Sequence, residues 1–141
     1  MNLKYWILAA RPKTLTAALI PVCTATALAF AQGHGRWLPA VVCMLFAALM
    51  QIAANFINDL FDFKKGTDRE DRLGPERACA QGWITPQAMK RGIGVMLVLA
   101  CAVGCCLLPY GGWVLVGIGV ACVVFAFLYT TLLSYMGCGD V

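Results

Sequence analysis

Long uncharged intervals dominate the pattern of polar and apolar positions in this chain of 141 residues. They run over 14–35, 37–58 and 92–139. Each of the first two approaches or exceeds the roughly 20 apolar residues that a helix needs to cross a bilayer, and the third is long enough for two crossings. The Pro and Gly of "LPYGG" at 108–112 indicate a tight turn between those two. The pattern therefore predicts four transmembrane helices, over about 14–33, 37–58, 89–108 and 112–134.

Composition favours a membrane protein over a soluble one, because 61% of the residues are hydrophobic, 13% are charged and the mean hydropathy is +0.77. The N-terminal apolar run is similar to a signal peptide, but the charged segment 11–13 interrupts it and another span follows, so we expect a retained span. Six of the eight cysteines lie within predicted spans, at spacings that fit no metal-site pattern. We therefore expect these to be small apolar packing residues: Cys23, Cys43, Cys101, Cys105, Cys106 and Cys122.

The positions of the basic residues predict the orientation of the spans. Ten of the eleven Lys and Arg precede the first span or lie in and beside the loop predicted over about 59–88, and the exception is Arg36. Basic residues near span ends are held on the cytoplasmic side. We therefore expect the N-terminus, the 59–88 loop and the C-terminus on that side. All seven acidic residues fall on the same predicted side.

Polar side chains follow one face at the end of the second predicted span. Asn55, Asn58, Asp59 and Asp62 stand at i, i+3, i+4 and i+7, which places them within an arc of roughly 100° on a helix. Carboxylate and amide oxygens without a neighbouring His or thiolate are the ligands that Mg²⁺ prefers. A membrane boundary also collects charges, but these residues begin inside the span, where polar groups are costly and usually functional. The pattern favours a magnesium site.

The basic residues that follow this face suit an anionic ligand. Together with Gly66, Gly74 and Pro75, they form a loop that could fold over phosphate oxygens, with Arg supplying two-pronged donors and Lys supplying point charges. Any one of these residues, taken alone, could instead be a solvated residue of a cytoplasmic loop. As a set next to an acidic face, they predict a site for a metal and a diphosphate. The basic residues in this set are Lys64, Lys65, Arg69, Arg72 and Arg77.

Five motifs are spread over essentially the whole chain: "RPKTL" (11–15), "QIAANFINDLFDFKKGTD" (51–68), "RLGPERACAQGWITPQAM" (72–89), "LYT" (128–130) and "GCGD" (137–140). Together they resemble the UbiA-type intramembrane aromatic prenyltransferases, and in particular the 1,4-dihydroxy-2-naphthoate polyprenyltransferases of menaquinone synthesis. Gly66 and Leu133 stand where the 4-hydroxybenzoate branch carries Asp and Lys, which favours the naphthoate branch. The Gly-Gly-Pro-x-Pro-Leu run that the naphthoate branch usually shows after the Tyr-Thr pair is absent from "TTLLSYMG".

The resemblance implies an all-α bundle of about nine transmembrane helices in a bacterial cytoplasmic membrane, with the active site on the cytoplasmic side. Four of these helices and one of two aspartate-rich motifs are present, so we interpret 1–141 as the N-terminal part of the enzyme and expect it to be inactive alone. The substrates implied are a polyprenyl diphosphate and 1,4-dihydroxy-2-naphthoate, the products demethylmenaquinol, diphosphate and CO₂, and the cofactor Mg²⁺. No nucleic-acid partner is expected.

The resemblance and the local pattern together assign roles to individual residues. Asp59 and Asp62 are expected to be catalytic metal ligands, with Asn55 and Asp68 as further ligands. Tyr129 is expected to line the pocket or stabilise an allylic cation through its ring, although a tyrosine of the membrane interface is equally plausible there. The residues expected to contact diphosphate are Asn55, Asn58, Lys64, Lys65, Arg72, Arg77 and Arg11. For Arg11, an equal alternative is that it only helps to keep this end of the span on the cytoplasmic side.

Other functions remain open at this point. The acceptor could be another aromatic compound such as 4-hydroxybenzoate. A cation transport protein could also place Asp59 and Asp62 in a span, but polar residues should then recur at matching depth in several spans. The third and fourth predicted spans contain almost none. A non-catalytic membrane remnant is a further alternative.

Overall fold

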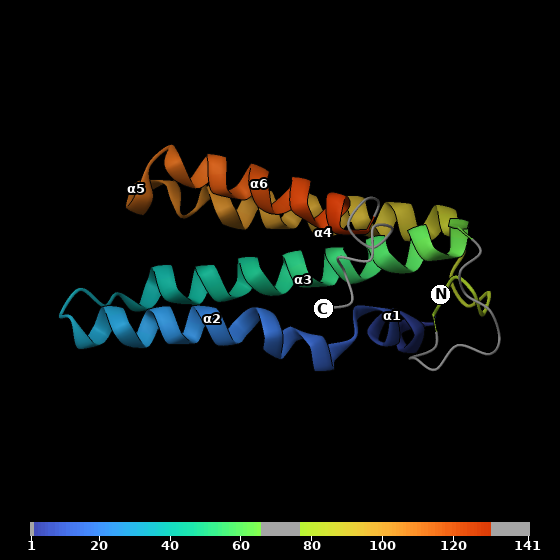
Figure 1. Cartoon of the computed structure of the whole chain (residues 1–141), viewed down its shortest axis with the longest axis horizontal. Coiled ribbons are helices and arrows are strands. Elements are labelled where there is room, and N and C mark those ends of the chain that lie inside the picture. The colour runs from blue at the N-terminus through green and yellow to red at the C-terminus, as the bar shows by residue number, and fades with distance from the viewer. Residues whose placement is uncertain (1, 66–76, 131–141) are drawn as a thin grey trace.

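The computed structural model describes residues 2–65 and 77–130, and every regular element in those two ranges is a helix. The long helix α3 contacts α1, α2, α4 and α6 and lies between the first two and the last two (Figure 1). This arrangement confirms the predicted all-α polytopic bundle. In chain order the helices are α1 (Leu3–Ala10), α2 (Pro12–Ala31), α3 (Trp37–Lys65), α4 (Pro86–Cys105), α5 (Leu108–Gly111) and α6 (Val114–Leu128).

Three helices, α2, α3 and α4, are long and apolar enough to cross a membrane, and α6 is a shorter apolar helix. Neither α2 nor α6 has a buried residue, and large apolar side chains such as Leu38, Val98 and Phe125 are exposed. So much contiguous apolar surface is unfavourable in water and is typical of contact with lipid. The chain is therefore an integral membrane protein. Of the fourth predicted span, 131–134 lie outside the described residues.

The helix α3 extends beyond the predicted end of the second span at 58 and continues to Lys65. No Gly or Pro lies between Ala40 and Lys65 to end it. Its 29 residues make a helix about 43 Å long at about 1.5 Å per residue, whereas the hydrocarbon core is about 30 Å thick. The helix is therefore longer than the apolar layer is thick, and its last turns carry the polar face.

The predicted loop 59–88 thus begins inside α3, and it also ends inside α4. That helix starts at Pro86, because the Thr85 side chain caps it by accepting a hydrogen bond from the backbone N–H of Ala88 at 3.3 Å. At the other end of the bundle, the predicted turn at 108–112 contains the short helix α5 and closes at Gly112, whose φ of 63° suits glycine.

A separate N-terminal helix, α1, was not predicted from the sequence. It ends at Arg11, which adopts a left-handed conformation with φ 48° and ψ 71°. Pro12 has no N–H to continue the helical hydrogen bonds, so α2 starts there as a new helix. The Arg11 carbonyl accepts from both the backbone N–H and the hydroxyl of Thr14, each at 2.9 Å. The chain therefore breaks sharply between α1 and α2.

The buried core lies at one end of the bundle, where α1, the end of α3 and the start of α4 meet (Figure 1). The segment 77–84, which we call the return turn, leads back into α4 at this end. The segment 32–36 and α5 lie at the opposite end. The core side chains are Ala9, Phe56, Ile57, Leu60, Ala78, Cys79, Ile84, Met89 and Ile93.

Candidate functional site

The carboxylate of Asp59 is 1% exposed and is held by the return turn. Its two oxygens accept hydrogen bonds from the backbone N–H groups of Ala78, at 2.9 Å, and Cys79, at 3.0 Å. Both of these residues are almost fully buried. A buried carboxylate needs such donors, because an ion without partners in a low-dielectric interior is very costly. Asp59 is therefore joined to the core rather than open to the surface.

The guanidinium of Arg77 lies against the next turn of α3. One nitrogen, Nη1, donates to the Asn58 backbone carbonyl at 2.9 Å, and the other, Nη2, forms an ion pair with the Asp62 carboxylate. The Arg77 and Asp62 side chains are 9% and 15% exposed. Partial burial reduces screening by solvent, so a direct charge pair here is stronger than one on an open surface. The structure brings the predicted anionic and cationic residues into contact.

The Asn58 side chain is held from the end of α6. The hydroxyl of Thr130, 2% exposed, donates to the Asn58 amide oxygen and also lies 3.3 Å from the Ala126 carbonyl. No role was assigned to Thr130 from the sequence, although it ends the "LYT" motif and is a polar residue directly after an apolar helix. Its contact places the end of α6 against the polar face of α3.

Asn55 is 4% exposed and points toward the break between α1 and α2. Its amide nitrogen donates to the Ala10 carbonyl at 2.7 Å and to the Thr14 hydroxyl at 2.8 Å. These contacts hold two segments that lie more than 40 positions earlier in the chain. The amide oxygen is not used by either bond. The predicted polar face thus has its first residue at a helix junction.

The remaining candidates are less closely gathered. The ammonium group of Lys64 lies 5.5 Å from the centre of the Phe61 ring, a distance typical of a cation–π contact. Tyr129 is 45% exposed at the end of α6. Arg11 occupies the break described above. The candidates Asp68 and Arg72, together with the side chain of Lys65, lie outside the described residues.

The chemistry of the donors fits a hard divalent cation only in part. Asp62 and Asn58 offer carboxylate and amide oxygens one helical turn apart, the donor types that Mg²⁺ prefers. These oxygens also have partners, since Asp62 pairs with Arg77 and Asn58 accepts from Thr130, but the Asp62 side chain is 15% exposed. Asp59 is only 1% exposed, and buried backbone N–H groups engage both of its oxygens. Across 2–65 and 77–130, no cluster of three or more His, Cys, Asp or Glu side chains is found that could hold a metal ion. The fit therefore rests on Asn58 and Asp62.

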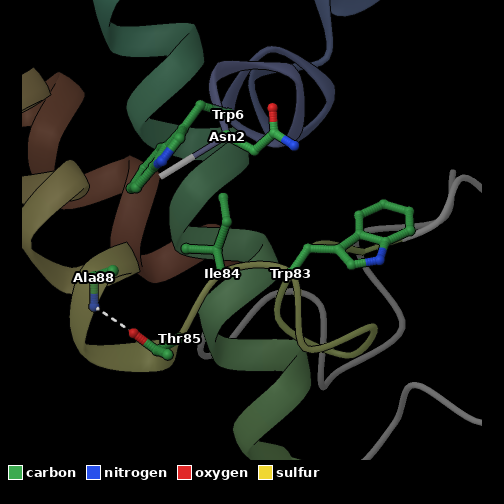
Figure 2. Close-up of a pocket in the computed structure, with 6 residues that line it drawn as sticks. All are labelled: Asn2, Trp6, Trp83, Ile84, Thr85 and Ala88. Carbon is green, nitrogen blue, oxygen red and sulfur yellow. Dashed lines mark hydrogen bonds between the residues drawn. The ribbon is translucent and has the colours of Figure 1, made fainter.

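Two cavities flank α1 on the same end of the bundle. The smaller, about 190 Å³, lies between the start of α1, the return turn and the start of α4 (Figure 2). Its residues include Asn2, Trp6 and Trp83, and the Trp83 ring also stacks on Tyr5 with centroids 4.9 Å apart. The larger, about 550 Å³, is an apolar groove between α1, α3 and α4 with Arg91 among its lining residues. Neither cavity is lined by residues of the polar face.

Comparison with known proteins places this chain beside one family. The family model described as "UbiA prenyltransferase family" matches residues 18–141. A 1,4-dihydroxy-2-naphthoate octaprenyltransferase of Escherichia coli is 38% identical over 96% of this chain and 47% of its own length. A protein of the same name from Haemophilus influenzae is 35% identical over 99% of this chain and 49% of its own length.

A more distant relative has a different name. The "UbiA prenyltransferase domain-containing protein 1" of Xenopus tropicalis is 35% identical over 72% of this chain and 29% of its own length. The chain therefore spans about half the length, or less, of the curated relatives that it matches. No solved structure matches it.

Proposed function

The chain belongs to the UbiA prenyltransferase family, and we propose from this that the whole protein transfers a polyprenyl group from polyprenyl diphosphate to 1,4-dihydroxy-2-naphthoate. The allylic C–O bond to the diphosphate breaks, a C–C bond to the aromatic ring forms, and the ring carboxylate leaves as CO₂. The product is demethylmenaquinol, on the route to menaquinone. The naphthoate acceptor is supported by the names of the relatives and by Gly66 and Leu133.

One observation carries this proposal furthest, namely the contact between Arg77 and the Asp62 end of α3. It brings a cation from the return turn onto an acidic helix face at the border of the apolar layer. A substrate with a polyprenyl chain and a diphosphate needs such a border, because the chain dissolves in the bilayer and the diphosphate does not. The site is polar where the diphosphate would lie, and exposed apolar helices adjoin it.

In the proposed reaction, the residues of this chain act on the leaving group. Negative charge grows on the diphosphate as the C–O bond breaks, and a guanidinium can stabilise it with two parallel hydrogen bonds. Arg77 is the described residue best placed for this, with Arg11, Lys64, Lys65 and Arg72 proposed as further contacts. Tyr129 is proposed to face the allylic cation through its ring.

Asn58 and Asp62 are the residues proposed to hold Mg²⁺, with Asn55 and Asp68 as weaker proposals. Asp59, a leading candidate from the sequence, becomes a weaker one, because the backbone N–H groups of Ala78 and Cys79 engage both of its oxygens. When bound, Mg²⁺ would supply Lewis-acid stabilisation of the departing diphosphate. In the structure the Asp62 carboxylate is neutralised by Arg77. A metal ion held by Asp62 would share this carboxylate with Arg77, which is proposed to contact the phosphate oxygens.

Replacing Asp62 with alanine in the whole protein tests this function. We expect Asp62→Ala to lower the turnover of polyprenyl diphosphate and 1,4-dihydroxy-2-naphthoate by on the order of a hundredfold or more, because a charged group next to the leaving group is lost. The measurement is the formation of prenylated product in membranes with Mg²⁺ present. Phe63→Ala is a matched control, because Phe63 is a 40% exposed apolar neighbour on the same helix.

Near-normal turnover in Asp62→Ala would rule out the assigned site. The acceptor is tested separately, by offering the unchanged protein 1,4-dihydroxy-2-naphthoate and 4-hydroxybenzoate in parallel. Prenylation of the second compound alone would move the protein to a different acceptor while leaving the diphosphate site intact.

A further inference from the structure

We propose that Asp59 is a positioning residue, whose buried carboxylate fixes the return turn on α3 and thereby holds the Arg77 guanidinium beside Asp62. The effect of Asp59 on substrate binding rests on the proposed function. The anchoring of the return turn on α3 by Asp59 does not depend on that function. Two carboxylates one turn apart would then have separate tasks. Asp62 would meet the ligands, and Asp59 would place the cation.

The first step of the argument is the backbone of the return turn. The N–H of Gln81 bonds to the Arg77 carbonyl at 3.0 Å, and the N–H of Trp83 bonds to the Ala78 carbonyl at 2.9 Å. The turn thus starts like a helix, and the first N–H groups of a helix have no carbonyl partner within it. In the return turn these are the N–H groups of Ala78 and Cys79, and both donate hydrogen bonds to the Asp59 carboxylate. The carboxylate completes the start of the turn.

The second step is burial. Ala78 and Cys79 are 1% and 2% exposed and pack in the same core as Ile57 and Leu60 of α3. An N–H group buried there without an acceptor would destabilise the folded state, because its lost hydrogen bonds to water would not be replaced. Losing the Asp59 carboxylate would therefore favour a state in which the turn lifts off the helix and its amides reach water.

The third step links the turn to Arg77. This residue directly precedes Ala78, so any movement of the anchored amides moves the Arg77 backbone as well. The guanidinium reaches both Asp62 and the Asn58 carbonyl from this position. A displacement of about 1 Å at a positioning group is enough to weaken such contacts markedly. Asp59 therefore acts on the site through Arg77.

The anchoring is tested by the reactivity of the Cys79 thiol, in protein in which Cys79 is the only cysteine. We expect Asp59→Asn to raise the rate of maleimide labelling by about ten- to a hundredfold, because the amide side chain keeps one acceptor and turns a donor toward the second N–H. Asp62→Asn is the matched control and should leave the labelling rate within about twofold. Equal labelling of both variants, or no increase in Asp59→Asn, would overturn the anchoring.

Hydrogen exchange of the unchanged protein gives a second measurement that needs no variant to fold. The amides of Ala78 and Cys79 should exchange on the order of a hundredfold more slowly than that of Ala80, which is exposed. Exchange of all three amides at one rate would contradict a turn held by Asp59, even if Asp59→Asn does not fold.

The link to Arg77 is tested by a double-mutant cycle on the binding of farnesyl diphosphate with Mg²⁺. Asp59→Asn is expected to weaken binding about tenfold in the unchanged background and by less than about twofold in Arg77→Ala. A tenfold loss in both backgrounds would show that Asp59 acts independently of Arg77 and is not its positioning residue. Failure of the unchanged protein to bind the probe would instead contradict the proposed function, and the labelling result would stand.

Discussion

Asn55 shows how a polar residue inside a membrane helix can serve the fold. Its amide nitrogen holds Ala10 and Thr14 at the break between α1 and α2. We expect Asn55→Ala to lower stability by about 1–3 kcal/mol, because two partly buried acceptors lose their donor. Thermal unfolding in detergent measures this. Thr14→Val, which removes one of the two acceptors, should cost less.

The two roles of Asn55 are separable by experiment. If Asn55→Ala unfolds at the same temperature as the unchanged protein but no longer binds diphosphate with Mg²⁺, the residue is a ligand and its contacts with α1 and α2 contribute little. If stability falls and the residual folded protein still binds the probe, the amide is mainly structural.

At the residue scale, the sequence predicted which side chains share a face but not what each would contact. The spacing of Asn55, Asn58, Asp59 and Asp62 follows from helical periodicity, and α3 confirms that all four lie on one continuous helix. Their partners come from distant segments, namely Thr14, the return turn and Thr130. Such contacts depend on tertiary packing, which periodicity within one helix does not describe.

Among the helices, the packing of α1 on α4 depends on Gly92. A Cβ atom built on Gly92 would lie 2.5 Å from the Trp6 ring, whereas one on Gly94 meets nothing within 4 Å. We expect Gly92→Ala to destabilise the protein by about 1–3 kcal/mol, because the indole must move. Gly94→Ala should be neutral or slightly stabilising, since alanine favours a helix.

Thermal unfolding in detergent separates these two variants, with fluorescence as a local probe in protein whose only tryptophan is Trp6. A large change in emission is expected in Gly92→Ala alone, because the Trp6 ring also packs edge-on against Phe56, with centroids 5.3 Å apart. Equal stability and equal emission in the two variants would show that α1 does not depend on this close approach.

The long apolar elements were predictable because their composition and length are set by the bilayer. The predicted spans overlap α2, α3, α4 and α6, with ends shifted by a few residues. The sequence did not predict α1, or that α3 continues past its polar face to Lys65. Hydropathy does not decide these ends, because the left-handed Arg11 before Pro12 separates α1 from α2 and no Gly or Pro ends α3 earlier.

At the scale of the whole molecule, the buried core cluster and most charged residues of the described ranges lie at one end of the bundle. The core joins α1, α3, the return turn and α4, and the polar contacts of Asp59, Arg77 and Asn55 are attached to the same segments. Toward the opposite end, α2 and α6 present apolar surfaces without a buried residue. A buried, hydrogen-bonded end beside exposed apolar helices fits the proposed diphosphate site.

The orientation predicted for this end rests on charge and is open to a direct test. The segments 1–13 and 59–91 carry ten of the eleven Lys and Arg, and basic residues near span ends stay in the cytoplasm. We expect alkaline phosphatase, which is active only after export, to be inactive when fused after Arg77 and active when fused after His34. The return turn and the segment 32–36 lie at opposite ends of the bundle (Figure 1). High activity after Arg77 with low activity after His34 would invert the topology and move the proposed diphosphate site to the other side of the membrane.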